Sequence, residues 1–448
     1  MDALGSADRC FCQLHNLKPS DFLSRLADWS VTSFHAGKLE VSKKLSLRSI
    51  LSSPGELLGY QNFCGLLLGE RRLEFAERMV KYAECFEQTS KTFLHKGVIS
   101  LRRNELADAK RLFVQAIDIE PEMVDARFNI SLMNLKAGEV EAGLQEFDLR
   151  WQRPFIERLY EMHPTPDLDI PVWQGTDLEG KRIYVRGEQG IGDEIWFASA
   201  LEPLINCGAR VTLECNPKLV SLLQRSFPSV DVQGFGLRRM PQAQNFDFQI
   251  PIGSILQHIF RSGYTVPTNY LKPDPNLVAK LRRVYSKNEE TKVVGLSWRS
   301  LKGKKRDSFQ APLEAWKSIE NLHKCTFISL QYGETEQEIA AFAEKTGIHI
   351  LQDPSIDTYN NVDGVAAQIK AADAVISIAN FTIMLAHATG TPSWAALRPF
   401  QDDWRFQNHD KKSFWLPACK QFWPSKSSDW RATISQIGVD MKQQFSER

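Results

Sequence analysis

The sequence lacks the features that would place the chain in a membrane, on nucleic acid or in an oxidising compartment. Its 55 Lys and Arg residues balance 54 Asp and Glu residues, so the net charge of +1 provides no global field for nucleic acid or an anionic membrane. No apolar run reaches membrane-spanning length, and the first fifteen residues have no basic segment followed by an apolar core, so we expect neither a transmembrane segment nor a signal peptide. Eight cysteines are too sparse for a disulfide-stapled secreted domain, and we expect a reducing, cytoplasmic setting.

Metal-ligand patterns are also scarce. Cys10, Cys12 and His15 could contact one ion together, but no second ligand pair lies nearby. Structural zinc sites use four protein ligands, so free cysteines are the favoured interpretation. We therefore expect no metal site.

The first third of the chain carries a weak repeat that is typical of paired helices. Small or apolar residues recur with one spacing in two sets, which are Ala76, Val80 and Ala83 and, 33 residues later, Ala109, Phe113 and Ala116. This spacing matches the second helix of a helix-turn-helix unit, with small side chains where the two helices touch.

The segment TFLHKGVISLRRNELADAKRLFVQAIDIEPEM resembles a tetratricopeptide repeat, with Gly97 and Pro121 at family positions beside the residues above. A second unit starts at Ala126 and includes Gly138 and Gly143, residues 57–89 are interpreted as a third, and residues 18–50 as a degenerate cap. Stacked units usually present a concave surface to an extended peptide, so we expect a protein or peptide partner, although padding of the next domain is an alternative.

Beyond residue 180, apolar runs of strand length alternate with helical patterns. RIYV, RVTLEC and FDFQI lie in a first half, and KVVGLSW, CTFISLQ, HILQD, DAVISIA and PSWAAL in a second. This alternation predicts two parallel sheets with a cleft at the carboxyl ends of their strands. We expect a helical domain at 1–155, a proline-rich linker at 156–180, and α/β domains at 181–278 and 279–448, the last ending in a helix that packs across the pair.

A glycine turn follows the first strand in YVRGEQGIGDEIWF. Gly187, Gly190 and Gly192 have the order G-x-x-G-x-G instead of the dinucleotide order G-x-G-x-x-G, and no Gly-Lys-Ser/Thr follows them. Glu214 does end the next strand, so a nicotinamide dehydrogenase stays a distant alternative. The favoured interpretation is a tight turn whose bare backbone leaves room for a substrate, with Asp193 in the first turn of a helix.

Several ordered motifs resemble the heptosyltransferase-like GT-B glycosyltransferases, particularly the branch that carries tetratricopeptide repeats. They are RGEQGIGDEIWFASAL, VVGLSWRS, FISLQYGE, DAVISIANFTIMLAHATG and DDWRF, and the resemblance covers residues 90 to about 440. It implies an N-terminal helical repeat domain followed by a GT-B fold of two Rossmann-like domains. It also implies an inverting, metal-independent transferase with a nucleotide-sugar as substrate and no cofactor.

The resemblance assigns the acceptor to the first α/β half and the donor to the second. Asp193 matches the family's general base, and Glu188, Gly190 and Gly192 belong to the acceptor-side loop. The implied donor-binding residues are Arg299, Lys302, Lys305, Gln331, Asn380, Phe381, Thr382, His387 and Trp404. Cations and a capped helix N-terminus can bind a diphosphate, although the basic segment could equally be a solvated loop.

One departure from the family pattern concerns its histidine, which is replaced by Met384. Methionine cannot donate a hydrogen bond to phosphate. His387 either replaces it in part or is a buried core histidine, and Trp404 either stacks on the donor or packs in the core.

The resemblance therefore implies transfer of a sugar to a hydroxyl, with a protein acceptor docked by the repeats, as in repeat-bearing protein O-glycosyltransferases that include flagellin-modifying enzymes. Two alternatives stay open. One is a heptosyltransferase-like enzyme of bacterial surface-polysaccharide assembly, and the other is a catalytically degenerate GT-B scaffold that binds peptides, which the missing histidine favours.

Overall fold

The computed structural model describes residues 19–153, 169–235, 245–260, 265–286, 288, 290–300, 311–322, 324–398, 403–407, 413–424 and 430–446. The chain divides into two compact units. The helical unit comprises residues 1–134 and 145–159, and the α/β unit comprises residues 135–144 and 160–448. The predicted boundaries at 155, 180 and 278 stay a prediction.

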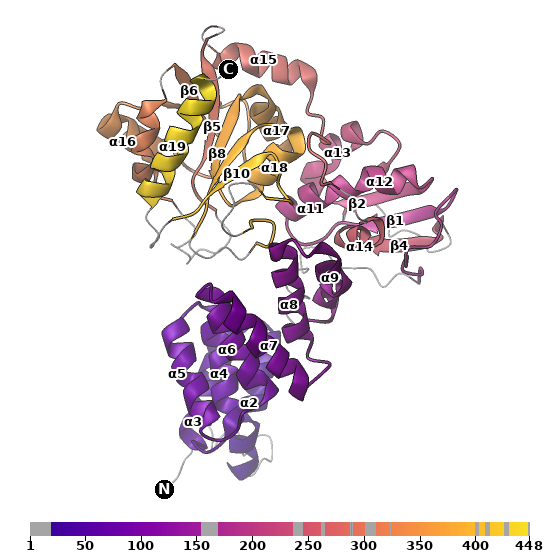
Figure 1. Cartoon of the computed structure of the whole chain (residues 1–448), viewed down its shortest axis with the longest axis vertical. Helices are drawn as coiled ribbons and strands as arrows, with labels where there is room; N and C mark the ends of the chain where they lie inside the picture. Colours follow the sequence, from indigo (N-terminus) through magenta and orange to yellow (C-terminus); the bar gives the residue numbers. More distant parts are fainter. Residues whose placement is uncertain are drawn as a thin grey trace. The chain divides into compact units, whose positions relative to one another are not determined.

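The helical part is a series of helix pairs (Figure 1). In order, these are α2 (Pro19–His35) with α3 (Leu39–Ser52), α4 (Leu57–Gly69) with α5 (Leu73–Glu84), α6 (Ser90–Arg102) with α7 (Leu106–Ile119), and α8 (Val124–Ala137) with α9 (Val140–Gln145), before the 3-10 helix η1 (Phe147–Gln152). The turn within each pair contains one left-handed residue, namely Gly37, Arg71, Asn104 and Gly138, with φ of 83°, 60°, 63° and 85°. These positions are 34, 33 and 34 residues apart, so the helix pair occurs four times with a nearly constant period.

The small residues of the repeat lie where the paired helices touch, as predicted. Ala109, Phe113 and Ala116 are fully buried on α7. A Cβ atom on Gly97 of α6 would lie 2.6 Å from Cε1 of Phe113, a distance that real Cβ atoms do not adopt. Glycine at this position therefore lets the aromatic ring pack directly on the backbone of the partner helix.

The first half of the α/β unit contains a four-stranded parallel sheet. Its strands β1 (Arg182–Arg186), β2 (Arg210–Cys215), β3 (Asp231–Gly234) and β4 (Phe248–Pro251) lie in the order β3-β2-β1-β4. The helices between and after them are α11 (Ile191–Phe197), α12 (Leu201–Asn206), α13 (Val220–Ser226) and α14 (Ile255–Ile259). The strand order reverses between β1 and β4.

The second half contains a six-stranded parallel sheet of the order β10-β9-β8-β5-β6-β7. Its strands are β5 (Lys292–Ser297), β6 (Cys325–Ser329), β7 (Ile350–Leu351), β8 (Ala374–Ile378), β9 (Ser393–Ala396) and β10 (Cys419–Phe422). Read from β7, this is the doubly wound order 3-2-1-4-5-6, which reverses between β5 and β8. The helical repeat and the two Rossmann-like sheets confirm the predicted fold class.

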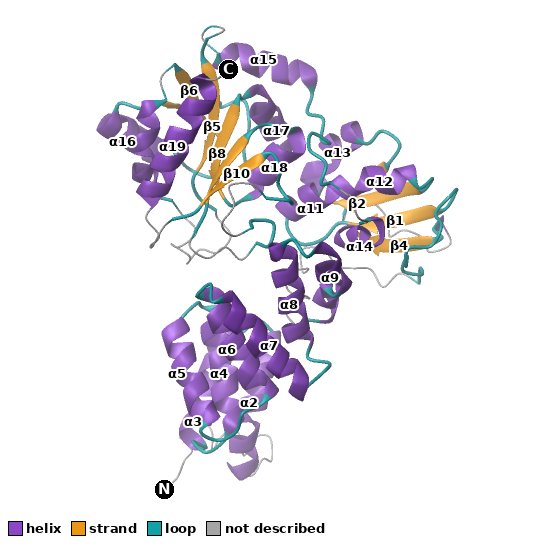
Figure 2. Ribbon diagram, viewed as in Figure 1, coloured by secondary structure: helices purple, strands orange, loops and turns teal. Residues whose placement is uncertain are grey.

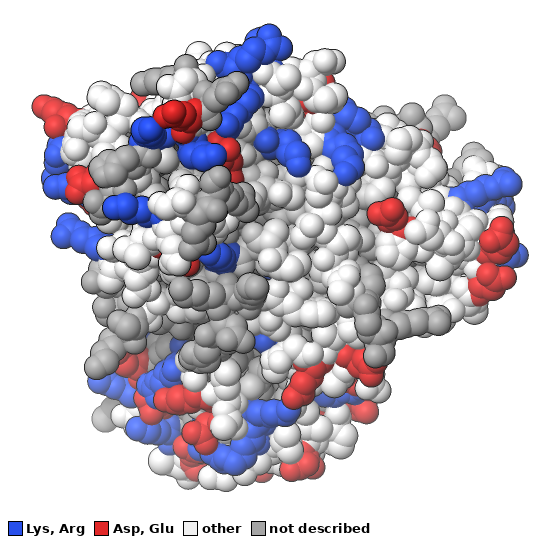
Figure 3. Space-filling model, turned by 45° about the horizontal axis from the view of Figure 1, so that its top comes forward, with Lys and Arg blue, Asp and Glu red and all other residues white. Residues whose placement is uncertain are grey.

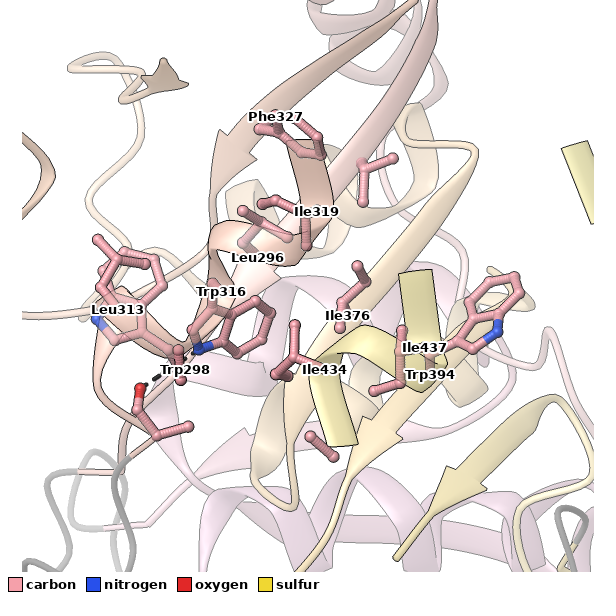
Figure 4. Packing of buried hydrophobic residues seen from close by; sticks show 14 of the residues in the cluster. Leu296, Trp298, Leu313, Trp316, Ile319, Phe327, Ile376, Trp394, Ile434 and Ile437 are labelled. Carbon is pink, nitrogen blue, oxygen red and sulfur yellow. Dashed lines mark hydrogen bonds between the residues drawn. The ribbon is translucent and has the colours of Figure 1, made fainter. Parts of the chain in front are cut away.

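Helices cover both faces of this second sheet (Figure 2). Helices α15 (Pro275–Tyr285), α17 (Val362–Ala371) and α18 (Phe381–Thr389) pack with one another, and α16 (Glu336–Thr346) and α19 (Trp430–Ser446) pack with the 3-10 helix η7 (Leu313–Asn321). On the η7 side, Trp298, Trp316 and Ile434 belong to one buried core, and Trp316 Nε1 donates to the Ala311 carbonyl at 3.3 Å (Figure 4). This packing holds the carboxyl end of β5 in place.

Lys and Arg as well as Asp and Glu residues are present on the face shown in Figure 3. No described helix combines the length and the apolar character needed to cross a bilayer.

Candidate active site

The predicted site residues follow the carboxyl ends of the central strands in both sheets. β1 leads into the glycine turn and Asp193, β5 leads into Arg299, and β8 leads into Asn380 and α18. In each sheet these strands flank the point where the strand order reverses. Open α/β sheets bind their ligands at that point.

The glycine turn is a capped helix start. Gly190 is the N-cap of α11, and its backbone N–H donates to Oδ2 of Asp193 at 3.0 Å, while the Asp193 N–H donates to the Gly190 carbonyl at 2.8 Å. The left-handed residue in the turn is Gln189, with φ of 66°. The Asp193 carboxylate is therefore fixed relative to the end of β1.

The space beside two of the three turn glycines, Gly187 and Gly192, is taken up by the protein, and the room for a substrate at this turn stays a prediction. A Cβ on Gly187 would lie 2.8 Å from the Glu214 carbonyl, and a Cβ on Gly192 would lie 3.2 Å from Cβ of Phe381. Because Gly187 has no side chain, the turn can approach β2, and the Gly187 N–H donates to the Glu214 carbonyl at 2.6 Å. Gly192 allows α11 to approach the first residue of α18.

Two buried glutamates connect the turn and α11 to neighbouring segments through hydrogen bonds. Glu188 is fully buried, and its Oε1 accepts a hydrogen bond from the Gly253 N–H at 2.6 Å, which ties the turn to the end of β4. Glu194 is 1% exposed, and its Oε2 accepts from the Asn216 N–H at 2.7 Å. Burial raises the pKa of Glu194 to about 8, the Asn216 bond opposes this, and the carboxylate of Asp193 adds to it.

Sequence reasoning missed Glu194. The signal was available, because this acid stands directly before the apolar run Ile195–Phe197, all of which is buried. An acid next to such a run is buried on folding, and burial raises its pKa.

Asp193 is paired with a cation from the other half of the unit. Arg405 Nη2 lies 2.5 Å from Oδ1 of Asp193, and Nη1 lies 2.9 Å from Oδ2 of Asp403. Burial alone would lower the pKa of Arg405, but the two carboxylates raise it above its usual value, so the guanidinium stays charged. The Asp193 side chain keeps 23% of its surface exposed, whereas that of Arg405 keeps 4%.

At the start of α18, Asn380 links three elements. Its Oδ1 accepts from the Thr382 N–H at 2.9 Å and so caps α18, and its Nδ2 donates to Ser297 Oγ at the end of β5 at 2.9 Å. Ser377 of β8 donates to the same Oδ1 at 3.0 Å. The Thr382 hydroxyl is buried and finds no hydrogen-bond partner within the described part of the chain. These groups can hold an anion at the start of α18.

Gln331 fixes the chain that leaves β5. Its Oε1 accepts from the backbone N–H groups of Trp298 and Arg299 at 3.0 and 2.9 Å and lies 3.3 Å from Ser297 Oγ. The side chain is 2% exposed, so it shapes the loop from inside.

The guanidinium of Arg299 is bound within the second half. Nη1 lies 2.8 Å from Oε2 of Glu338, and Nη2 donates to the Glu334 carbonyl at 2.5 Å. These contacts hold Arg299 against the start of α16, and its predicted phosphate contact stays a prediction. Lys302 and Lys305 lie outside the described residues.

His387 and Trp404 are core residues in the structure. His387 is fully buried, and burial lowers its pKa to about 4 against a smaller opposing effect of the Pro267 carbonyl, so the ring is neutral at neutral pH. Trp404 is 7% exposed and packs edge-on against Trp196 and Trp415, with ring centroids 5.3 and 4.7 Å apart. Because protein encloses both rings, the structure favours the packing alternatives for them, while their predicted contact with a donor stays a prediction.

A set of aromatic side chains that sequence reasoning missed lies beside Phe381. The ring of Tyr332, which follows β6, lies 5.8 Å from that of Phe381 and 6.2 Å from that of Tyr359. Tyr359 is 58% exposed, and Lys218 Nζ lies 3.8 Å from its ring centroid. The signal was the tyrosine directly after Gln331. Among the residues described, no cluster of three His, Cys, Asp or Glu could hold a metal ion.

Among known protein families, no family model matches the chain. Protein FlbA of Caulobacter vibrioides is 26% identical over 460 residues, which cover 92% of this chain and 77% of that protein. The glycosyl transferase family 9 structure from Veillonella parvula DSM 2008 has a TM-score of 0.45 at 11% identity and covers 61% of this chain and 99% of its own.

Two further solved structures are similar. The ADP-heptose lps heptosyltransferase II of E. coli has a TM-score of 0.44 at 10% identity, over 59% of this chain and 99% of its own. An O-GlcNAc transferase of Thermobaculum terrenum has a TM-score of 0.38 at 13% identity, over 95% of this chain and 91% of its own. The chain is thus similar to glycosyltransferases of these kinds, while its own fold is defined by the helix pairs and the two parallel sheets described above.

Proposed function

We propose that the chain is an inverting glycosyltransferase that moves a sugar from a nucleotide-sugar to an acceptor hydroxyl. The observation that carries the proposal is the contact between Gly192, next to Asp193, and Phe381, the first residue of α18. A Cβ on Gly192 would be 3.2 Å from Cβ of Phe381, so the proposed base and the proposed diphosphate site are neighbours. Direct displacement at a sugar carbon needs both groups close to the reacting atoms.

The donor diphosphate would lie at the start of α18. The Thr382 hydroxyl, which has no hydrogen-bond partner among the residues that the structure describes, can donate to its oxygens, and the N-terminus of a helix favours negative charge. Lys302 and Lys305 would add positive charge as the leaving group becomes more negative. Because these groups supply that charge, the proposed reaction requires no metal ion.

The acceptor would lie at the glycine turn. Asp193 would take the proton of the hydroxyl as its oxygen attacks the anomeric carbon on the face opposite the diphosphate, which inverts the configuration. The 23% exposure of the Asp193 side chain leaves it accessible to such a hydroxyl.

We further propose that the acceptor is a protein side chain and that the helical repeats dock the protein. Repeat stacks of this kind usually bind extended peptides. A saccharide acceptor is the alternative within the same enzyme class. A degenerate peptide-binding scaffold is a second candidate, favoured by Met384, which is 3% exposed and offers no polar group to a phosphate.

Thermal-shift titrations with UDP-, ADP-, GDP- and CMP-sugars and NAD test the donor. A true donor at about 100 times its Kd should stabilise the protein by about 2.7 kcal/mol. If none of the nucleotides shifts the melting temperature, the transferase proposal is wrong and the scaffold is supported. Stabilisation by NAD alone would favour a dehydrogenase.

Asp193→Asn tests the base. It should lower the rate at which the stabilising donor releases its nucleotide by about 10²- to 10⁴-fold, with the donor-induced shift in melting temperature retained. Glu202→Gln, an exposed acid on α12, is the matched control and should leave the rate unchanged. Full activity of Asp193→Asn would remove this residue from the proposed role.

Removal of residues 1–134 tests the docking role. The shortened chain should still release nucleotide with water as acceptor but should no longer transfer a labelled sugar to protein in a lysate. Unchanged protein labelling would contradict docking by the repeats, and labelling of saccharide alone by the full chain would favour the saccharide acceptor.

A further inference from the structure

The ion pair between Asp193 and Arg405 joins the proposed acceptor turn to the segment between β9 and β10. Both oxygens of the Asp193 carboxylate are engaged, Oδ2 by the Gly190 N–H at 3.0 Å and Oδ1 by Arg405 Nη2 at 2.5 Å. Each oxygen still has a second lone pair, and the side chain stays partly exposed. The carboxylate is therefore oriented without being closed to an acceptor.

Arg405 is itself held in one position. Its Nη1 and its backbone N–H both bond to Asp403, at 2.9 and 3.0 Å, and its carbonyl accepts from Ser413 Oγ at 2.6 Å. Its guanidinium carbon lies 5.1 Å from the ring centroids of both Trp196 and Trp404. A buried, caged guanidinium with a fork of donors is a rigid positioning group, unlike a solvated surface cation.

The surrounding charges explain why a cation is needed at this point. Asp403 lies on the same segment as Arg405, and Glu188 and Glu194 lie on the turn and on α11 beside Asp193. Without Arg405, Asp193 would face only carboxyl groups among these neighbours.

We infer that Arg405 is a positioning residue for the proposed transfer, which holds the Asp193 carboxylate toward the acceptor by taking one of its oxygens. The inference rests on the proposed function. In the step, the hydroxyl proton passes to Asp193, and the hydroxyl oxygen forms its bond to the anomeric carbon. The bond from that carbon to the diphosphate oxygen breaks, and the diphosphate leaves with the electron pair. Arg405 exchanges no proton and keeps its charge throughout.

The test is a cycle of variants in the full-length protein. Arg405→Met, Arg405→Lys and Asp193→Asn are made singly and together, and kcat for nucleotide release and the Kd are measured with the nucleotide-sugar that gives the largest thermal shift. Arg405→Met should lower kcat about 10- to 100-fold with the donor Kd within about twofold, because misplacement of a reacting group by 1 Å costs this much. Arg405→Lys should restore part of the loss. In the Asp193→Asn background neither substitution should lower kcat further.

Arg225→Met is the matched control. Arg225 on α13 pairs with Asp363 on α17 at 2.8 and 2.7 Å and so also connects the two halves, but through elements that hold neither Asp193 nor Arg405. All variants are compared at a temperature where circular dichroism shows them folded. If Arg405→Met does not fold, the kcat of Arg405→Lys is compared with that of the wild type instead. The control should keep the wild-type kcat.

Four outcomes would overturn the inference. An equal loss of kcat from the Arg405 substitutions in the wild-type and Asp193→Asn backgrounds, or an equal loss in Arg225→Met, would show a purely structural role. Full activity of Arg405→Met alongside an inactive Asp193→Asn would exclude the positioning role of Arg405 and leave the proposed function intact. Wild-type protein that releases no nucleotide from any donor would remove the proposed function, and this inference with it.

Discussion

Replacement of Glu194 by glutamine should stabilise the protein at neutral and alkaline pH. The wild-type carboxyl is buried beneath the glycine turn and accepts a hydrogen bond from the Asn216 N–H at 2.7 Å. A glutamine carbonyl can accept the same bond and carries no charge at any pH. The substitution therefore removes the cost of burying an ionised group while it preserves the shape of the site.

The sign and the size of the effect follow from the pKa of Glu194. Burial raises this pKa from an ordinary 4.5 to about 8, so between these values the folded state binds a proton that the unfolded state has lost. The stability from this group is complete below about pH 4.5 and is lost as the pH rises through about 8. At about 1.4 kcal/mol per pH unit, the loss is at most about 5 kcal/mol, or roughly 10 °C in melting temperature.

The assay is thermal unfolding followed by circular dichroism at pH 5, 7 and 8.5. The melting temperature of Glu194→Gln minus that of the wild type should become more positive at each step. Glu202→Gln on α12, where the acid is exposed, should show a constant difference. Parallel curves for Glu194→Gln and the wild type would refute the reasoning, since they would mean that Glu194 titrates alike in the folded and unfolded states.

Two further substitutions test packing. Gly97→Ala should destabilise the helical unit by about 1–2 kcal/mol in urea unfolding, because overpacking against Phe113 outweighs the helix propensity of about 1 kcal/mol that alanine contributes. The control is Gly65→Ala, whose Cβ would meet nothing closer than 3.8 Å and which should stabilise the unit by up to about 1 kcal/mol. Equal effects of both would contradict the packing argument. Gln331→Leu should cost about 1–3 kcal/mol by thermal unfolding, because it leaves the N–H groups of residues 298–299 without their acceptor, and an unchanged melting temperature would contradict this role of Gln331.

Most of the fold could be predicted because its signals are local. The spacing of Ala109, Phe113 and Ala116 reflects a contact between helices joined by a short turn, and it recurs in the sequence with every unit. The alternation of apolar runs with helical patterns likewise reveals parallel sheets without any long-range contact. The capping of α18 by Asn380 was equally readable, and its hydrogen bond to the Thr382 N–H confirms it.

The remaining features of the site depend on contacts between distant segments. Asp193 and Arg405 are 212 positions apart, and nothing in either motif indicates that the two side chains meet. The enclosure of Trp404 depends in the same way on Trp196, a residue of the other half. An aromatic residue after the last strand has the same local sequence whether it faces a ligand or the core. The donor-binding and acceptor-side roles of the site residues stay predictions.

Met384, which stands where the glycosyltransferases that the sequence resembles carry a histidine, lies where α11 approaches α18. Gly192 lies against Phe381, and Cγ of Met384 would be 3.8 Å from a Cβ on the same glycine. A thioether fills this apolar contact without needing a hydrogen-bond partner. In the proposed reaction, phosphate contact would then fall to the start of α18, where the Thr382 hydroxyl has no hydrogen-bond partner among the described residues. The loss of the histidine is therefore compatible with transfer, provided that the helix start and the basic segment supply the charge that it would have carried.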